Sequence, residues 1–267
     1  GTNALYIAIK LSGVNYGDEV ITQPLTFVAT CNAISYVGAK PIFIDVDRDT
    51  MGLSPSALNK FLTKNAERRF DGTYNKKNGK KISACVPMHT FGFPCRIKQI
   101  SDICKKWNIA VVEDAAESLG SYIGKKHTGT FSLMASLSFN GNKIITTGGG
   151  GMIITNDLNL ARRAKHITTT AKLPHSYEYM HDEIGYNYRM PNLNAALGCA
   201  QMECLEEILS IKKKLAYRWR AFFVKQKINI VKPLKGNKAN YWLNTVVLKS
   251  KKDRENFLKF TNKKGVM

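Results

Sequence analysis

Three short segments carry groups that could act on a small molecule. Lys143 lies in the Gly- and Asn-rich stretch SFNGNKIITTGGGG, Asp114 ends the run IAVVED, and Gly1-Thr2 precedes a helical pattern. A lysine amine can form a Schiff base with an aldehyde, and a carboxylate can keep a pyridine nitrogen protonated. The free backbone N–H groups at a helix start bind phosphate. Together these three groups meet the requirements for holding pyridoxal 5'-phosphate.

Taken singly, each segment has an ordinary structural explanation. Asp114 could equally be the N-cap of a helix that follows the strand. A lysine in a glycine-rich turn is commonly just exposed, and many helices begin with Gly-Thr. The glycine run 148–151 lacks both the GxxxxGK[ST] pattern and a strand-linked GxGxxG, so it is a weak nucleotide motif. The cofactor hypothesis therefore depends on the combination.

The elements that must position these groups are short apolar strands alternating with helical patterns. The predicted strands are 20–23, 42–45, 84–87 and 109–114, and the predicted helices are 4–13, 28–38, 54–62 and 96–107. This alternation predicts an α/β domain with a mostly parallel sheet covered by helices on both faces. Asp114 then lies at the carboxyl end of a strand, the edge where such sheets bind ligands. Two closely spaced strands, 136–139 and 151–155, predict an antiparallel hairpin that contains Lys143.

The last part of the chain has a different pattern. A long helical pattern runs from Asn192 to about Gln226, and 240–249 is predicted as a strand, whereas 71–81 is predicted as a polar loop. We therefore expect a large domain over residues 1–226 and the beginning of a smaller C-terminal α/β domain over 227–267. The chain starts with Gly inside a helical pattern and stops before the second domain could close a core, so both domains are expected to be truncated.

Bulk composition limits the possible partners. The 267 residues are 44% hydrophobic and 22% charged, which is typical of a packed globular core. The net charge of +20 would suit polyanions, but the lysines are dispersed and lack interleaved aromatic residues, so no nucleic-acid partner is expected. No apolar run is long enough to cross a bilayer, so no membrane partner is expected either.

Cysteine and histidine spacing argues against a metal site. The six cysteines form no CxxC pair, which indicates reduced thiols in the cytoplasm and no structural zinc. His166, His175 and His181 form no HEXXH pattern, and no carboxylate–histidine spacing repeats. We therefore expect no metal.

Six motifs resemble, in their order and spacing, the DegT/DnrJ/EryC1/StrS family of pyridoxal-phosphate-dependent nucleotide-sugar aminotransferases. They are GTNAL, TQPLTFVATCNAI, PIFIDVD, VVEDAAESLGSY, SFNGNKIITTGGGG and GYNYRMPNLNAALG. The resemblance covers the chain to about Gln226, and members normally extend further on both sides. It implies the large domain of a fold-type-I aminotransferase.

The resemblance also implies the roles of the residues that would hold the cofactor. Lys143 would form the covalent link to it, and Asp114 would pair with its ring nitrogen. The residues that would contact its phosphate are Gly1, Thr2 and Ser138. Lys143 and Asp114 are therefore the two expected catalytic residues.

Further residues are assigned by the same resemblance. Phe27 would stack on the cofactor ring, the alternative being a core Phe. Glu117 stands near the cofactor's 3'-oxygen, where many members have Gln or His, and this departure leaves its role open. Asn187 and Arg189 would reach a dimer partner's site, Asn187 toward the cofactor phosphate and Arg189 toward a substrate phosphate, unless Arg189 forms only a surface ion pair. His89 would line a sugar pocket, the alternative being a hydrogen-bonded core histidine.

The function implied is transamination of a nucleotide-linked keto sugar in bacterial surface amino-sugar biosynthesis. L-Glutamate is the expected amino donor, and a homodimer with shared active sites is the expected assembly. The wording of the Lys143 motif resembles members that act on UDP-4-keto-6-deoxy-N-acetylhexosamines. Two alternatives are a sugar dehydrase of the same family, which has His where this chain has Lys143, and a truncated remnant of the fold, or a basic binding protein, that does not catalyse.

Overall fold

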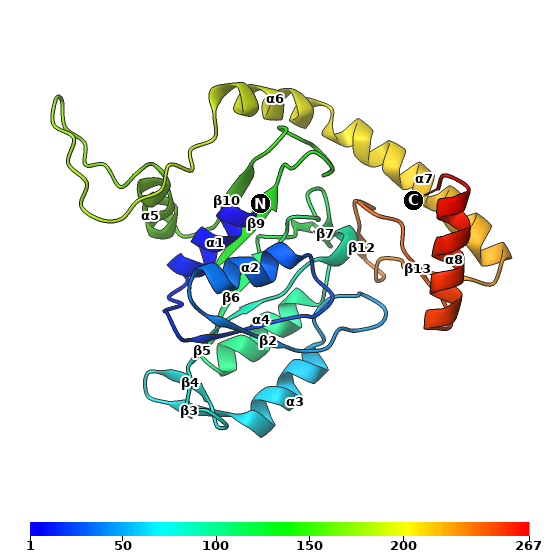
Figure 1. The fold of residues 1–267 in the computed structure, drawn as a ribbon, viewed down its shortest axis with the longest axis horizontal. Helices are drawn as coiled ribbons and strands as arrows, with labels where there is room; N and C mark the ends of the chain where they lie inside the picture. Colours follow the sequence, from blue (N-terminus) through cyan, green and yellow to red (C-terminus); the bar gives the residue numbers. More distant parts are fainter. Residues whose placement is uncertain (267) are drawn as a thin grey trace.

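A six-stranded sheet forms the centre of the molecule (Figure 1), and the computed structural model describes residues 1–266. The strand order is β10-β9-β6-β5-β1-β2. The strands are β1 (Glu19–Thr22), β2 (Lys40–Phe43), β5 (Ile82–Val86), β6 (Ala110–Asp114), β9 (Met134–Ser138) and β10 (Gly151–Ile154). All neighbours pair in parallel except β10, which is antiparallel to β9. The predicted mostly parallel sheet and its hairpin are confirmed.

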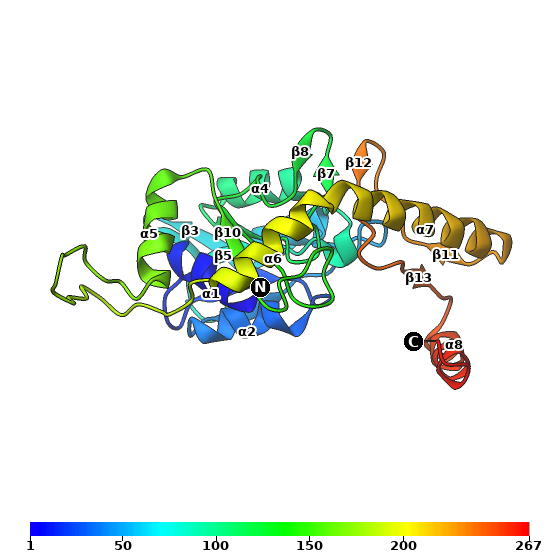
Figure 2. The same ribbon diagram turned by 90° about the horizontal axis from the view of Figure 1, so that it is seen from above.

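Helices cover both faces of this sheet. Successive strand residues point to opposite sides, and apolar residues on both sides pack against helices. In β1, Val20 packs against the helices of one face and Ile21 against those of the other. The first face carries α1 (Thr2–Leu11), α2 (Val28–Tyr36) and α5 (Leu158–Thr168), and the second carries α3 (Pro55–Asn65) and α4 (Ile97–Lys106). Figure 2 shows α4 and the pair α1 and α2 on opposite sides of the strands. The expected α/β layering is therefore confirmed.

The glycine run before β10 allows close packing beside the start of α1. A Cβ on Gly151 would lie 2.8 Å from the backbone nitrogen of Gly1 and 2.9 Å from the carbonyl oxygen of Leu137. Any side chain at this position would therefore push β10 away from α1 or β9. Gly151 is therefore needed for this close packing.

The long helix predicted from Asn192 is two helices. They are α6 (Asn192–Glu203) and α7 (Leu205–Lys225), which meet at an angle at Cys204 (Figure 1). Glu206 and Glu207 lie in the first turn of α7, where negative side chains favour a helix start. None of the helices within residues 1–266 is long and apolar enough to cross a membrane.

The predicted loop 71–81 and the predicted strand 240–249 were both wrong in detail. Within 71–81, β4 (Gly72–Asn75) pairs with β3 (Ala66–Arg69) in a hairpin whose two connecting residues are Phe70 and Asp71. Within 240–249, only β13 (Val246–Val247) is extended and paired, with β11 (Asn229–Ile230). Tyr241 adopts a φ of 53°, which interrupts an extended chain.

The remaining elements are short or terminal. They are η1 (Thr90–Gly92), β7 (Tyr122–Ile123), β8 (Lys126–His127), β12 (Asn237–Lys238) and α8 (Lys251–Lys263). β12 pairs with β7, so a segment beyond residue 226 adds to a small sheet of the large domain. Residues on the two sides of the proposed division at residue 226 are therefore in contact.

A buried carboxylate on β6 ties the sheet to its neighbouring loop. Glu113 has no exposed surface and accepts four hydrogen bonds of 2.7 to 3.0 Å from the loop 129–132. His89 Nε2 lies 2.9 Å from the same carboxylate, and His89 Nδ1 accepts from the N–H of Cys95. The proton of His89 is therefore on Nε2 and is donated to Glu113.

Replacing Glu113 by Gln should lower the free energy of unfolding by about 3 kcal/mol, because an NH₂ group would face N–H donors in a buried site. Chemical denaturation measures this, with the exposed Glu203→Gln as control. Burial raises the pKa of Glu113, but the hydrogen bonds from His89 and the loop outweigh burial and hold the pKa below its ordinary 4.5. The stabilisation is thus present above pH 4.5 and disappears as the pH falls through the lower folded pKa. A difference between the two proteins that grows in acid would contradict this assignment.

Candidate functional site

A cavity of about 270 Å³ opens at the carboxyl edge of the sheet. It collects seven residues that the sequence analysis assigned to the cofactor, which are Gly1, Thr2, Phe27, Asp114, Glu117, Ser138 and Lys143. They come from the starts of α1 and α2, the ends of β6 and β9, and the β9–β10 turn. The structure therefore brings together groups that lie up to 142 positions apart in the chain. Their roles stay predictions.

The amine of Lys143 is largely buried between an acid and an aromatic ring. Its Nζ lies 3.6 Å from Oε1 of Glu117 and 3.8 Å from the centre of the Trp242 ring. Burial lowers the pKa of Lys143, and the carboxylates of Glu117 and Asp114 act in the opposite direction. A lowered pKa increases the fraction of free amine, the form that attacks an aldehyde.

Asp114 is fixed by donors on two sides. Its Oδ2 accepts a 2.7 Å hydrogen bond from the hydroxyl of Thr30 on α2, and its Oδ1 accepts from the N–H of Ala116 at 3.1 Å. Residues 115–121 after β6 form turns, so Asp114 does not cap a helix. The carboxylate is therefore held at the cavity wall, where it can pair with a protonated ring nitrogen.

Glu117 has an environment that favours its protonated form. Its Oε2 accepts a 2.7 Å hydrogen bond from the N–H of Phe91, which has a left-handed φ of 59°. Burial raises the pKa of Glu117 to about 7, and Asp114 adds to the increase, whereas Lys143 and the Phe91 N–H oppose it. Near neutral pH Glu117 can therefore accept or give up a proton.

Donors for an anion gather where α1 begins. The first turn of α1, within the described chain, has no side-chain cap, so its N–H groups are available to a ligand. A Cβ on Gly1 would lie 2.7 Å from Cβ of Ser138, so glycine is needed for this approach. Among residues 1–266, the buried Oγ of Ser136 at the same wall has no hydrogen-bond partner.

These groups fit pyridoxal phosphate. Lys143 can form a covalent link to its aldehyde, and Asp114 can pair with its ring nitrogen. Ser138 and the first turn of α1 can donate hydrogen bonds to its phosphate. The unpartnered Ser136 hydroxyl is the kind of buried polar atom that a polar ligand satisfies. Phe27 is 63% exposed at the cavity and so is not a core residue, which leaves its ring free to stack.

Three assigned residues lie away from the cavity. His89 is wholly buried, with both ring nitrogens hydrogen-bonded, so it cannot touch a sugar and is the core histidine that was the alternative. Asn187 and Arg189 are exposed, and both belong to residues 171–190, here called the arm. The tip of the arm extends away from the sheet (Figure 1), whereas residues 186–188 hydrogen-bond to residues 167–170 at the end of α5. Neither Asn187 nor Arg189 is part of the described lining of its own chain's cavity.

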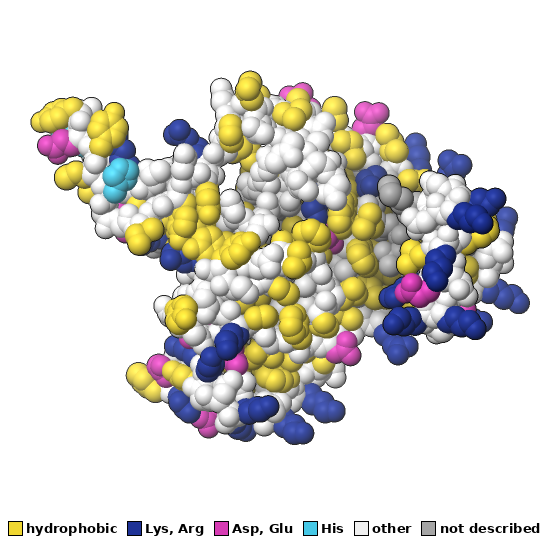
Figure 3. Space-filling model, viewed as in Figure 1, with side chains coloured by type: hydrophobic (Ala, Val, Ile, Leu, Met, Phe, Trp, Pro, Cys, Tyr) yellow, Lys and Arg dark blue, Asp and Glu magenta, His cyan; other side chains and the backbone are white. Residues whose placement is uncertain are grey.

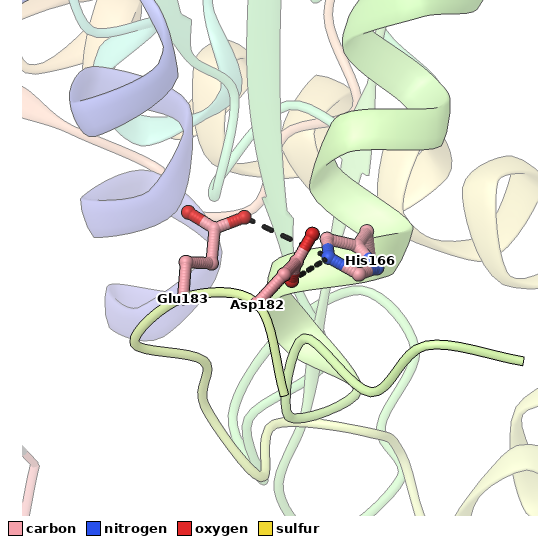
Figure 4. A group of neighbouring side chains, drawn as sticks. All are labelled: His166, Asp182 and Glu183. Carbon is pink, nitrogen blue, oxygen red and sulfur yellow. Dashed lines mark hydrogen bonds and ion pairs between the residues drawn. The ribbon is translucent and has the colours of Figure 1, made fainter. Parts of the chain in front are cut away.

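Ion pairs attach the arm to α5 (Figure 4). His166, Asp182 and Glu183 place ligand-type atoms within 4.8 Å of one another. His166 Nε2 lies 2.7 Å from Asp182, and Arg163 makes two hydrogen bonds to the carboxylate of Glu183. The arginine already neutralises one acid, so we interpret the cluster as an ion-paired anchor rather than a metal centre.

Two residues of the site were not found from the sequence. Asn240 is buried and donates through Nδ2 to the carbonyl oxygens of Glu117 and Leu119, each at 2.8 Å. Its Oδ1 accepts from the N–H of Trp242, whose indole Nε1 donates to the carbonyl of Asn142 at 2.7 Å. Asn240 is the first residue of the predicted strand 240–249, and nothing in that local sequence distinguishes it.

The chain is similar to known aminotransferases. The chain matches the DegT/DnrJ/EryC1/StrS aminotransferase family over residues 1–267. It is 38% identical over 255 residues to a GDP-perosamine synthase of Escherichia coli O157:H7, covering 96% of this chain and 65% of that protein. It is 37% identical over 249 residues to a Bacillus subtilis (strain 168) protein with the provisional name pyridoxal phosphate-dependent aminotransferase EpsN, covering 93% and 61%. The chain thus spans less than two thirds of the length of these relatives.

A solved structure shares the fold. Helicobacter pylori PseC, an aminotransferase involved in pseudoaminic acid biosynthesis, superposes with a TM-score of 0.87 at 23% identity, covering 99% of this chain and 69% of that one. At this identity the match concerns the fold. It agrees with the α/β architecture described above.

Removing the Asn240 side chain should detach the segment that carries Trp242. Asn240→Ala leaves two buried carbonyl groups and one N–H without partners, so we expect a loss of about 3 kcal/mol of unfolding free energy. Amides of residues 237–247 should also exchange hydrogen faster, as measured by mass spectrometry. The exposed Asn244→Ala is the matched control. Equal exchange in the two variants would show that Asn240 does not anchor the segment.

Proposed function

Since the chain belongs to the DegT/DnrJ/EryC1/StrS aminotransferase family, we propose that it catalyses pyridoxal-phosphate-dependent transamination of a nucleotide-linked keto sugar. The observation that carries this proposal is the shared cavity of Lys143, Asp114 and Ser138 at the start of α1. A dehydrase of the same family would have His at the position of Lys143. The intact set of cavity residues also argues against a remnant without catalysis.

The chain's own residues divide the chemistry among them. When bound, pyridoxal phosphate supplies an aldehyde that links to amines and a ring that withdraws electrons from the neighbouring C–H bond. Lys143, once released, takes the proton from Cα of the amino donor as a general base and returns it as a general acid. Asp114 keeps a proton on the ring nitrogen, and Ser138 with the first turn of α1 fixes the phosphate.

The identity of the sugar is the finer part of the proposal. The sequence motif around Lys143 favours UDP-4-keto-6-deoxy-N-acetylhexosamine as substrate. The Escherichia coli relative is named for a GDP sugar, which favours a GDP-linked 4-keto sugar instead. L-Glutamate is the proposed amino donor for both. Assays with each nucleotide sugar as acceptor decide between them.

We also propose a homodimer in which the arm serves the neighbouring cavity. Tyr177 and Tyr179 on the arm are 78% and 79% exposed, and apolar side chains are visible at its tip in Figure 3. Leu193 on α6 is 86% exposed. Exposed aromatic and arginine side chains are typical of interface hot spots. A two-fold axis would bring Asn187 and Arg189 of one chain to the cavity of the other.

Lys143→Ala should reduce transamination by about 10³-fold or more, because the variant loses both the covalent link and the proton carrier. The protein should remain folded, because Glu117, whose pKa is already raised to about 7, can take up a proton once its cationic partner is removed. The measurements are turnover and the visible absorbance of the linked cofactor, with exposed Lys125→Ala as control. Turnover retained in Lys143→Ala would contradict the proposed mechanism.

Mixing two inactive variants tests the shared site. Lys143→Ala and Arg189→Ala chains should recover activity together, because one of the two cavities in a mixed dimer has both residues. With random exchange, about a quarter of all cavities would be intact. Differently tagged chains provide the control for exchange. Exchange without any recovered activity would show that the arm serves its own chain.

A further inference from the structure

Lys143 has to be free of the cofactor during part of each cycle, if the proposed function is correct. Its amine is then a buried cation that needs compensation. We propose that Glu117 and Trp242 form a resting site. It holds the positively charged side chain of Lys143 next to the reaction centre while this side chain is not linked to the cofactor. In this scheme Trp242 is a positioning residue that acts through Lys143.

Two hydrogen bonds fix Trp242, one from its indole ring and one from its backbone. Its Nε1 donates to the carbonyl of Asn142, one residue before Lys143, and its backbone N–H donates to Asn240. The face of the ring is therefore presented to Nζ at 3.8 Å without further ordering of side chains. A cation over an indole face is the strongest of the cation–π pairs in proteins.

Above its pKa of about 7, Glu117 supplies the negative charge of the resting site. Its Oε2 is occupied by the N–H of Phe91, so Oε1 is the oxygen that faces Lys143. The separation of 3.6 Å exceeds that of a direct hydrogen bond. The amine is thus attracted by the carboxylate and the ring but not locked to either, which suits a group that must leave.

The other carboxylate of the cavity is already engaged. Asp114 accepts from Thr30 and from the N–H of Ala116. Asp114 also raises the pKa of Lys143, but under the proposed function it pairs with the ring nitrogen. Glu117 is then the acid that remains for the free lysine.

The pH dependence of Lys143 labelling in the cofactor-free chain tests this resting site. Hydroxylamine removes bound cofactor, and reductive methylation with formaldehyde and cyanoborohydride then modifies the free amine. The extent at Lys143 is read by peptide mass spectrometry, with exposed Lys125 as internal standard. Both partners favour the charged amine, so removing either must lower the labelling midpoint. We expect a decrease of about one pH unit in Trp242→Leu and in Glu117→Gln.

Controls separate this effect from a general loosening. Trp242→Phe retains an aromatic face and should recover most of the wild-type midpoint, and Trp219→Leu on α7 should leave it unchanged. If Trp242→Leu does not fold, Glu117→Gln decides alone. An unchanged or higher midpoint in the folded variants would overturn the resting site. Because no cofactor or sugar is present, this result is independent of whether the chain transaminates.

Discussion

Burying a carboxylate requires hydrogen-bond donors around it, and β6 ends in two carboxylates in succession. The pleat of the strand sends Glu113 toward the loop 129–132 and His89, and Asp114 toward the cavity. One acid is surrounded by donors and fixes the structure, whereas the other retains an open side for a ligand. A shift of one residue in the pairing of β6 would exchange them. The register of β6 is therefore the condition on which the position of the site depends.

The cavity concentrates charge where water is scarce. Asp114, Glu117 and Lys143 share one small volume, and burial acts on Glu117 and Lys143 in opposite senses, raising one pKa and lowering the other. Glu117, whose pKa is raised to about 7, can therefore accept or give up a proton near neutral pH. A lysine that has to attack, leave and carry a proton needs a partner with this property more than it needs a strong ion pair.

Local sequence pattern predicted the parts of the fold that depend on local physics. Apolar runs located β1, β5 and β6, and the rule that ligands bind at the carboxyl edge placed Asp114. Lys143 was found from its hairpin together with the family resemblance. The contact between Asn240 and Glu117 joins residues 123 positions apart, so no window of sequence contains it. The hydrogen bonding of buried His89 likewise depends on Glu113, which lies on β6, 24 positions further along the chain.

The hydrogen bonds that attach residues 240–242 to the cavity also affect the order of folding. Protein synthesis delivers the chain from its N-terminus, and every strand of the central sheet precedes residue 155. The sheet can therefore pair before Trp242 has been made, whereas the contact of Trp242 with Asn142 closes a loop of 100 residues. Such long-range closure is slow compared with pairing of nearby segments. The wall beside Lys143 is thus a late product of vectorial synthesis, and the nascent cavity remains open to solvent until that wall is in place.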